Sequence, residues 1–242
     1  MKLAIMQPYL FPYIGYFQLI NIVDKFVLLD DVNFTKKSWV NRNSILVKSN
    51  NGYESHLFSM PLANASQNIK INEVNRIESS AFNKKFLATI VSSYSKAPFF
   101  NDVFEMLTNI MSFEEANIAK FIYYSLQKVC EFIGIKTPMQ FSNDIEKDQS
   151  LRGQQRILEI CSCLKAQKYI NPVGGLELYT KDDFLAREID LLFLKTHSSL
   201  SYPQWDSRFI ANLSVLDILM FVSKPKIGEL LTQFDFISPE GF

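Results

Sequence analysis

The sequence predicts an α/β fold with three layers, in which helices cover both faces of a mostly parallel sheet. The first observation is a set of short, continuous apolar runs at residues 3–6, 26–29 and 191–194, which are typical of strands buried on both faces. The second is the order strand, tight turn, helix, strand over residues 3–29, because this order is a βαβ unit. The third is a block of amphipathic helical patterns, which indicates an additional helical subdomain.

The predicted domain organisation follows from the position of this helical block. Residues 1–80 are the N-terminal half of the α/β domain with a ligand loop, residues 81–135 are the helical subdomain or insertion, and residues 136–242 are the C-terminal half. The chain has 242 residues and 48% hydrophobic content, which is enough to bury a substantial core without disulfides or metal.

The N-terminal half opens with the βαβ unit. Pro12 suits a first helical turn, and Tyr13, Phe17 and Ile20 recur at helical spacing after it. Residues 36–51 are more polar and carry a cluster of basic side chains, so we expect a loop there. Strands are predicted at residues 53–61 and 69–77.

The remaining elements are mostly helical. Apolar side chains at helical spacing predict helices over residues 82–94, 103–110 and 114–133, the last with Ser112 and Glu115 as a capping box and Gly134 at its end. A polar connector over residues 142–150 leads to a helix around residues 157–164 and a strand at 168–172. Thr180 and Asp183 then cap a short helix before the strand at 191–194, Ser214 and Asp217 cap the next helix, and Pro225 opens the last.

Composition excludes several classes of protein. Lysine and arginine total 25 and aspartate and glutamate total 25, so the net charge of the chain does not favour binding to nucleic acid or to an anionic membrane. Three cysteines without framework spacing indicate a reduced compartment. Gln7, two prolines and Gly15 interrupt the apolar N-terminus, and no later stretch approaches eighteen apolar residues, so we expect neither a signal peptide nor a membrane span. The expected location is the cytoplasm.

Ligands of parallel sheets lie beyond the carboxyl ends of the strands, which here predicts a site formed by residues 7–15 and 30–37. Gln7 is a candidate substrate-binding residue in the first segment. Asp30 directly follows a strand and is the candidate acid or base, whereas the side chain of Asp31 points to the opposite side. A solvated turn or a cap is the alternative interpretation of this pair.

Basic and amide side chains in the following loop form a candidate phosphate site. Lys37, Asn41 and Arg42, with Lys36 beside them, would hold a phosphate or a sugar diphosphate, and arginine binds such groups in a bidentate way. The alternative is that they are solvated loop residues. Gly174 and Gly175 follow the strand at 168–172, so they face the first glycine turn across the sheet or form an ordinary turn.

Other chemistry-bearing residues give weaker signals. His197, one of two histidines, is a possible base, although a structural role is more common for such a residue. Cys161 and Cys163 lie in a helical pattern without a histidine at ligand spacing, so we predict no metal site.

Three segments resemble the WbqC-like family, which is found among genes for bacterial surface polysaccharide. They are Gln7 to Gln18 with the order Gln-Pro-Tyr-Leu-Phe-Pro-Tyr-Ile-Gly-Tyr-Phe-Gln, then Asp30 to Phe34, and Trp39 to Asn43. The resemblance extends from Met1 to about Ile218 and includes residues 94–100, 174–175 and 213–217.

The pattern Pro-Tyr-Ile-Gly-Tyr at residues 12–16 is also similar to the His-x-Gly-His signature of nucleotidyltransferases and pantothenate-synthetase-like ligases. This similarity implies a nucleotidyltransferase-like or Rossmann-like sheet in which Gly15 lets a ligand approach the backbone. Tyr13 and Tyr16 stand where the signature has histidines, and tyrosine donates a hydrogen bond but is no cation near neutral pH. In the alternative interpretation Gly15 permits close packing of the helix and the tyrosines fill a small core.

The family resemblance implies an enzyme of O-antigen assembly that transfers an acyl or aminoacyl group, such as glycine, to the amine of a nucleotide-linked amino sugar. Asp30, Tyr13 and Tyr16 are then the candidate catalytic residues, and the nucleotide-sugar is the expected partner. The sequence does not identify a cofactor, the acyl donor or the oligomeric state. Two alternatives stay open: a nucleotidyltransferase or ATP-dependent amide ligase, and a non-catalytic partner in a polysaccharide-enzyme complex.

Overall fold

A computed structural model describes residues 1–50, 52–77, 80–206 and 208–238 of the chain. Its centre is a six-stranded sheet in the order β10-β9-β8-β1-β2-β7. All neighbouring strands are parallel except β10, which runs antiparallel to β9. The strands are β1 (Lys2–Met6), β2 (Lys25–Leu28), β7 (Met139–Phe141), β8 (Lys168–Pro172), β9 (Asp190–Thr196) and β10 (Phe234–Ile237). The mostly parallel α/β sheet predicted from the apolar runs is confirmed, and β1 lies near its middle.

Alternate residues of the strands face two different helical layers. Ala4 and Phe26 belong to a core cluster with α1 (Ile14–Ile22), α4 (Ile118–Ile133), α7 (Val215–Phe221) and α8 (Lys224–Leu230). Leu3, Ile5 and Val27 pack on the opposite side with α5 (Gly153–Cys163) and α6 (Lys181–Leu185). This alternation is the physical basis of the three layers, because successive side chains of a strand point to opposite faces.

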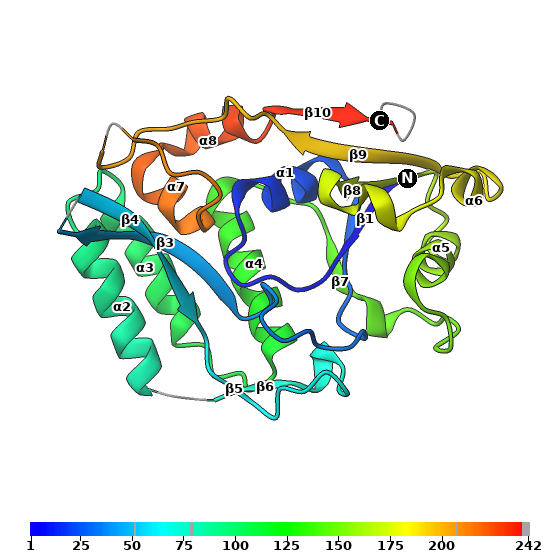
Figure 1. Cartoon of the computed structure of the whole chain (residues 1–242), viewed down its shortest axis with the longest axis horizontal. Helices are drawn as coiled ribbons and strands as arrows, with labels where there is room; N and C mark the ends of the chain where they lie inside the picture. The colour runs from blue at the N-terminus through cyan, green and yellow to red at the C-terminus, as the bar shows by residue number, and fades with distance from the viewer. Residues whose placement is uncertain (51, 78–79, 207, 239–242) are drawn as a thin grey trace.

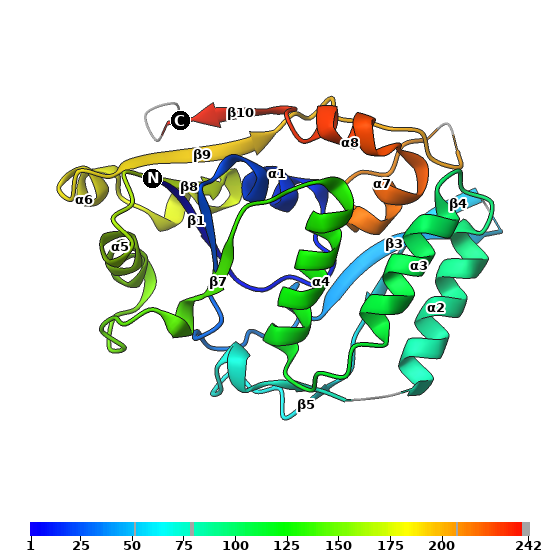
Figure 2. The same ribbon diagram turned by 180° about the vertical axis from the view of Figure 1, so that it is seen from behind.

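The predicted helical block is present as α2 (Ser80–Tyr94), α3 (Phe100–Met111) and α4. Figures 1 and 2 both show α2 and α3 side by side, next to a hairpin of β3 (Arg42–Ser49) and β4 (Gly52–Ser59) that stands apart from the main sheet. The apolar side chains of the block share one continuous core cluster with α1. The division of the chain at residues 81 and 135 stays a prediction.

Several local predictions are wrong. Residues 42–49 form β3 rather than a loop, because Ile45 and Leu46 are buried while the basic side chains that suggested a loop remain nearer the surface. The segment 69–77 holds the 3-10 turn η1 (Ile71–Glu73) and the two-residue strand β6 (Asn75–Arg76), which pairs with β5 (Leu62–Ala63). β7 has three residues with Gln140 at its centre, and β10 contains Asp235 and is partly exposed, so neither gives a continuous apolar run.

The helix ends give a mixed outcome. The N-cap of α4 is Asn117, whose side chain accepts a hydrogen bond from the Lys120 N–H at 3.1 Å, so the predicted Ser112–Glu115 box is wrong. Gly134 ends α4 with a φ of 83°, as predicted. Ser214 caps α7 through the Leu216 N–H, and Pro225 lies in the first turn of α8. Within the described residues, no helix is long and apolar enough to cross a membrane.

Candidate functional site

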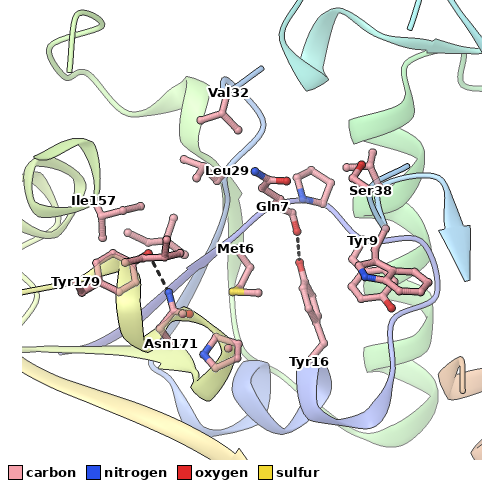
Figure 3. Close-up of a pocket in the computed structure, with 18 of the residues that line it drawn as sticks. Met6, Gln7, Tyr9, Tyr16, Leu29, Val32, Ser38, Ile157, Asn171 and Tyr179 are labelled. Atoms are coloured by element: carbon pink, nitrogen blue, oxygen red, sulfur yellow. Dashed lines mark hydrogen bonds between the residues drawn. The ribbon is translucent and has the colours of Figure 1, made fainter. Parts of the chain in front are cut away.

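A large cleft opens at the carboxyl ends of β1, β2 and β8, with a volume of about 800 Å³. This is the edge of the sheet at which the sequence predicted a ligand. Figure 3 shows Met6, Gln7 and Tyr16 in the middle of the cleft, Tyr9 and Ser38 on one side, and Asn171, Tyr179 and Ile157 on the other. The lining consists of Ile5, Met6, Gln7, Pro8, Tyr9, Tyr13, Tyr16, Leu29, Val32, Ser38, Trp39, Val40, Gly153, Gln154, Arg156, Ile157, Asn171, Pro172, Gly174, Gly175, Leu178, Tyr179 and Asn212.

The turn between β1 and α1 forms the floor of the cleft and is held from two distant segments. Phe11 has a φ of 45°, which L-residues rarely adopt. The Asn43 amide donates to the carbonyls of Leu10 and Phe11, and the Ser214 hydroxyl donates to the Phe11 carbonyl at 2.8 Å. Asn43 and Ser214 both lie in segments that resemble the WbqC-like family, so part of that resemblance reflects how the turn is fixed.

Two of the resembling segments, residues 94–100 and 213–217, meet in a buried hydrogen-bond network. Asp217 on α7 is fully buried and accepts hydrogen bonds from the hydroxyls of Tyr94 and Tyr202 at 2.7 and 2.8 Å, and from the Gln204 amide at 2.8 Å. Tyr94 in turn accepts from the Leu46 N–H at 2.8 Å. The network joins α2, α7 and β3 and leaves Asp217 outside the cleft lining.

The tyrosines of the turn are neutral hydrogen-bonding groups. Tyr16 is buried and donates to the Gln7 carbonyl at 2.9 Å, which fixes the start of the turn (Figure 3). Burial raises the pKa values of Tyr9, Tyr13 and Tyr16 above the ordinary value of 10.0. These phenols therefore donate hydrogen bonds at neutral pH and do not act there as bases.

Gly15 is packed against the protein rather than against the cleft. A Cβ on Gly15 would lie 2.4 Å from Cε2 of Tyr13 and 2.8 Å from Oγ1 of Thr196. Gly15 is buried and is absent from the cleft lining. These neighbours fit the packing role that the sequence left as the alternative, and a ligand contact at Gly15 stays a prediction.

An aromatic pair forms one wall of the cleft. The rings of Tyr9 and Trp39 stack with centroids 5.8 Å apart and an interplanar angle of 26°. Trp39 nevertheless remains 50% exposed. Arg42 lies behind this wall: its Nε donates to the Ser38 carbonyl at 3.1 Å, and its guanidinium carbon is 5.6 Å from the centroid of a Trp39 ring. A half-exposed indole at the mouth of a cleft offers a flat apolar surface to a ligand ring.

The opposite wall is built around the amide of Asn171 at the end of β8. Its Nδ2 donates to the hydroxyl of Tyr169 at 2.6 Å and to that of Tyr179 at 3.0 Å, and the two hydroxyl oxygens are 3.1 Å apart. A Cβ on Gly175 would lie 2.7 Å from the Asn171 Oδ1. Gly175 therefore leaves the space that the Asn171 oxygen occupies.

Arg156 on α5 is the charged residue in the cleft lining, and its charge is held within the protein. Its guanidinium donates to the carbonyls of Asp31 at 2.8 Å, Leu151 at 3.0 Å and Gln149 at 3.1 Å. The Asp31 carboxylate lies 3.6 Å from Arg156 and 2.9 Å from the buried Lys147 ammonium. Burial by itself would raise the pKa of Asp31, but the adjacent Lys147 ammonium and the Arg156 guanidinium outweigh it and lower this pKa.

Asp30 is also buried and lies outside the cleft lining. Its carboxylate accepts hydrogen bonds from the Asn143 N–H at 3.0 Å and from the Asn72 amide at 3.3 Å. Burial raises the pKa of Asp30 despite these bonds. The carboxylate thus ties two distant loops to the end of β2.

The structure brings together half of the residues predicted from the sequence. Gln7, Tyr13, Tyr16, Gly174 and Gly175 line the cleft. The other five lie outside its lining: Gly15, Asp30, Lys37, Asn41 and Arg42. Lys37 is exposed, and the Asn41 amide donates to the Met60 carbonyl at 2.7 Å. Four further residues line the cleft and were not among the predicted ones: Tyr9, Trp39, Asn171 and Tyr179. Tyr9 and Trp39 lie in the resembling segments, and Asn171 lies near the carboxyl end of the strand predicted at residues 168–172.

A smaller cavity of about 290 Å³ adjoins the cleft at the carboxyl end of β9. Tyr13 and Asn212 line both cavities. His197 lines the smaller one, and its Nε2 is 3.3 Å from Oδ1 of Asp235. The two cavities are therefore neighbours on one edge of the sheet, with Tyr13 and Asn212 between them.

Comparison with known proteins gives a consistent assignment over most of the chain. A family model described as the WbqC-like protein family matches residues 7–229. A protein of Mycobacterium tuberculosis (strain ATCC 25618 / H37Rv), named Uncharacterized protein Rv1507c, is 27% identical over 223 residues, which cover 91% of this chain and 94% of that protein. No solved structure matches the chain.

Proposed function

The chain belongs to the WbqC-like protein family, and on this premise we propose that it is an enzyme of bacterial surface-polysaccharide assembly. The proposed reaction transfers an acyl or aminoacyl group, such as glycine, to the amine of a nucleotide-linked amino sugar. The gene context of the family suggests the pathway. The pair of cavities that share Tyr13 and Asn212 is the main support for a transfer reaction, because a transferase must hold two substrates next to each other.

The larger cleft suits the nucleotide-sugar. Its volume of about 800 Å³ lies within the range of about 300–1,000 Å³ that is usual for small-molecule sites. Trp39, supported by Tyr9, offers a stacking surface for a nucleobase. The smaller cavity suits the acyl or aminoacyl end of the second substrate, which we expect to be a thioester or an ester.

The proposed chemistry is aminolysis. The amine nitrogen attacks the carbonyl carbon of the donor, a C–N bond forms, and the C–S or C–O bond to the leaving group breaks. We assign the nitrogen proton to the imidazole of His197, which Asp235 orients and which then passes it to the leaving sulfur or oxygen. Tyr13 would donate its neutral hydroxyl to the developing oxyanion. Asp30, held by Asn143 and Asn72 outside the cleft, has a positioning role here.

Binding of the two substrates is the direct test. Trp39 reports on the cleft by fluorescence, whereas the indole of Trp205, the second of the two tryptophans, is bonded to the Ser93 carbonyl and stacked on Tyr53. We expect UDP-glucosamine to change Trp39 fluorescence, and an acyl thioester added with it to give an amide product detected by mass spectrometry. Binding of ATP in place of nucleotide-sugars would favour the ATP-dependent ligase function. Binding of neither ligand would contradict an enzymatic function.

A matched pair of variants locates the binding to the cleft. Gln7 and Gln155 are both exposed glutamines, but Gln7 lines the cleft and Gln155 faces Arg187 on the outside of α5. Gln7→Ala should weaken UDP-glucosamine binding, whereas Gln155→Ala should leave it unchanged. Equal affinities of the two variants would place the ligand elsewhere.

One observation favours a second candidate function, that of a non-catalytic partner in a polysaccharide-enzyme complex. Among the described residues that line the larger cleft there is no aspartate, glutamate, histidine, lysine or cysteine, and Arg156 is engaged by backbone carbonyls. A protein of this kind would bind the nucleotide-sugar without converting it. His197→Ala separates the two functions, because only an enzyme loses turnover while keeping affinity.

A further inference from the structure

We infer that the carboxamide oxygen of Asn171 is the specificity-determining group of the cleft, and that it accepts a hydrogen bond from an N–H or O–H donor on the sugar of the substrate. The inference rests on the proposed binding of a nucleotide-sugar and adds where and by what group the sugar is recognised. Asn171 does not appear among the residues that the sequence motifs single out.

The orientation of the amide follows from the triangle of Asn171, Tyr169 and Tyr179. With Nδ2 toward the tyrosines, its two hydrogens bond to the two hydroxyl oxygens, and one hydroxyl donates to the other across 3.1 Å. With Oδ1 there instead, both hydroxyls would donate to it, and no hydrogen would remain for the contact between them. Three hydrogen bonds form in the first arrangement and two in the second, so the network fixes Nδ2 toward the tyrosine hydroxyls and Oδ1 away from them.

The Asn171 Oδ1 is available to accept a hydrogen bond from a ligand. The Asn171 side chain lines the cleft although only 6% of the residue is exposed. Within the described part of the chain, no donor bonds to its Oδ1. Gly175 also lines the cleft and has no Cβ that would collide with this oxygen. Figure 3 shows the Asn171 nitrogen turned to Tyr179 and the side chain at the edge of the cleft. A rigid, nearly buried acceptor selects strongly, because a ligand without a donor leaves it unpaired.

The Asn171 Oδ1 selects a hydrogen-bond donor and disfavours phosphate. An acceptor oxygen repels the oxygens of a diphosphate, so the phosphates must lie away from Asn171. The opposite wall carries the Tyr9–Trp39 pair, which suits the base. A nucleotide-sugar is therefore placed with its base on Trp39 and its sugar toward β8. An uncharged acceptor also leaves a sugar amine in its neutral, nucleophilic form, whereas a carboxylate would favour the ammonium form.

A scan of the sugar with fluorine tests this assignment. The probes are UDP-glucose and its analogues with fluorine in place of the hydroxyl at C2, C3, C4 or C6, titrated against Trp39 fluorescence. Fluorine keeps the size of the hydroxyl but donates no hydrogen bond. We expect one position at which fluorine weakens binding on the order of five- to tenfold. An amino group at that same position should restore the affinity.

The same scan on Asn171→Ala completes a double-mutant cycle. In this variant the hydroxyls of Tyr169 and Tyr179 still pair with each other, so the wall is kept. The fluorine effect should disappear, and all probes should bind alike. The inference is overturned if no fluorine position weakens binding to the unaltered protein, or if the loss persists in Asn171→Ala.

Failure of the proposed function gives a different result. If UDP-glucose and UDP-glucosamine both fail to bind, nucleotide-sugar recognition is wrong. The inference about Asn171 is then decided by NMR of its side-chain NH₂ group. Slow exchange of these protons with water, together with a shift of the signal on addition of millimolar glucosamine, supports it. Fast exchange, or a signal that glucosamine leaves unmoved, overturns it.

Discussion

Replacement of Gly15 by alanine tests whether the opening motif positions Tyr13 by packing. The added Cβ would meet the Tyr13 ring at 2.4 Å and the Thr196 hydroxyl at 2.8 Å. Both distances are shorter than van der Waals contact, and the Thr196 hydroxyl is already held by Gln18 at 2.7 Å. Overpacking of this kind typically costs about 1–3 kcal/mol of folding free energy. For a chain of this size, each kcal/mol lowers the melting temperature by about 2–4 °C.

The matched control for this substitution is Gly228→Ala. Gly228 also lies in a helix, α8, and apart from its chain neighbours and the backbone of its own helix no atom lies within 4 Å of the position of its Cβ. Alanine there should be neutral or stabilise the protein by about 0.4–1 kcal/mol. Differential scanning calorimetry of the two variants without ligand gives the comparison. A Gly15→Ala protein as stable as Gly228→Ala, with lost ligand binding, would refute the packing argument and return Gly15 to direct ligand contact.

Three further predictions concern binding, pH and the buried network. Trp39→Ala should weaken UDP-glucosamine binding by roughly 1–3 kcal/mol, the range for loss of base stacking on an aromatic ring. Arg42→Ala should weaken it less, because the Arg42 side chain contacts Trp39 and not the cleft. Isothermal titration calorimetry measures both affinities, and a larger loss for Arg42→Ala would indicate direct phosphate contact. Because the Asp31 pKa is lowered in the folded state, the contribution of Asp31 to stability is present above the unfolded pKa and is lost as pH falls through the folded pKa. Urea unfolding should therefore show the unaltered protein to be more stable than Asp31→Asn at pH 7, and this difference should close below the ordinary value of 3.8. A difference in stability that does not depend on pH would contradict the ion pair. Tyr94→Phe leaves the Leu46 N–H and one Asp217 oxygen without a hydrogen-bond partner and should lower the folding free energy by about 1–3 kcal/mol for each group. The loss should be larger than for Tyr123→Phe, because the Tyr123 hydroxyl makes one hydrogen bond, to the Met139 carbonyl at 3.1 Å.

The central sheet could be predicted from the sequence because burial on both faces leaves a visible pattern. The runs at residues 3–6, 26–29 and 191–194 have few polar interruptions, and each corresponds to a parallel strand of the sheet. β3 could not be recognised in the same way, because one side of the hairpin is exposed and its basic residues resemble a loop. β7 and β10 have three and four residues and are defined by pairing with distant strands.

The location of the cleft could be predicted, but its composition could not. Gln7 and Gly175 follow strand ends in the sequence, and the topology brings these ends together. Asp30 also follows a strand end, yet Asn143 and Asn72, which are distant in the sequence, occupy its carboxylate. The role of Asn171 depends on Tyr169 and Tyr179, which orient its amide and lie on either side of it in the sequence. Such side-chain networks depend on tertiary packing, and single-chain patterns do not encode them.

The most informative measurement is a crystal structure of the protein with bound UDP-glucosamine. We expect the ligand in the cleft beyond β1, β2 and β8, with its base on Trp39 and its sugar within hydrogen-bond distance of the Asn171 Oδ1. The amine should point past Tyr13 toward the cavity that holds His197. A ligand bound on another face of the protein, or one lying in the cleft with its diphosphate against Asn171, would contradict this expectation.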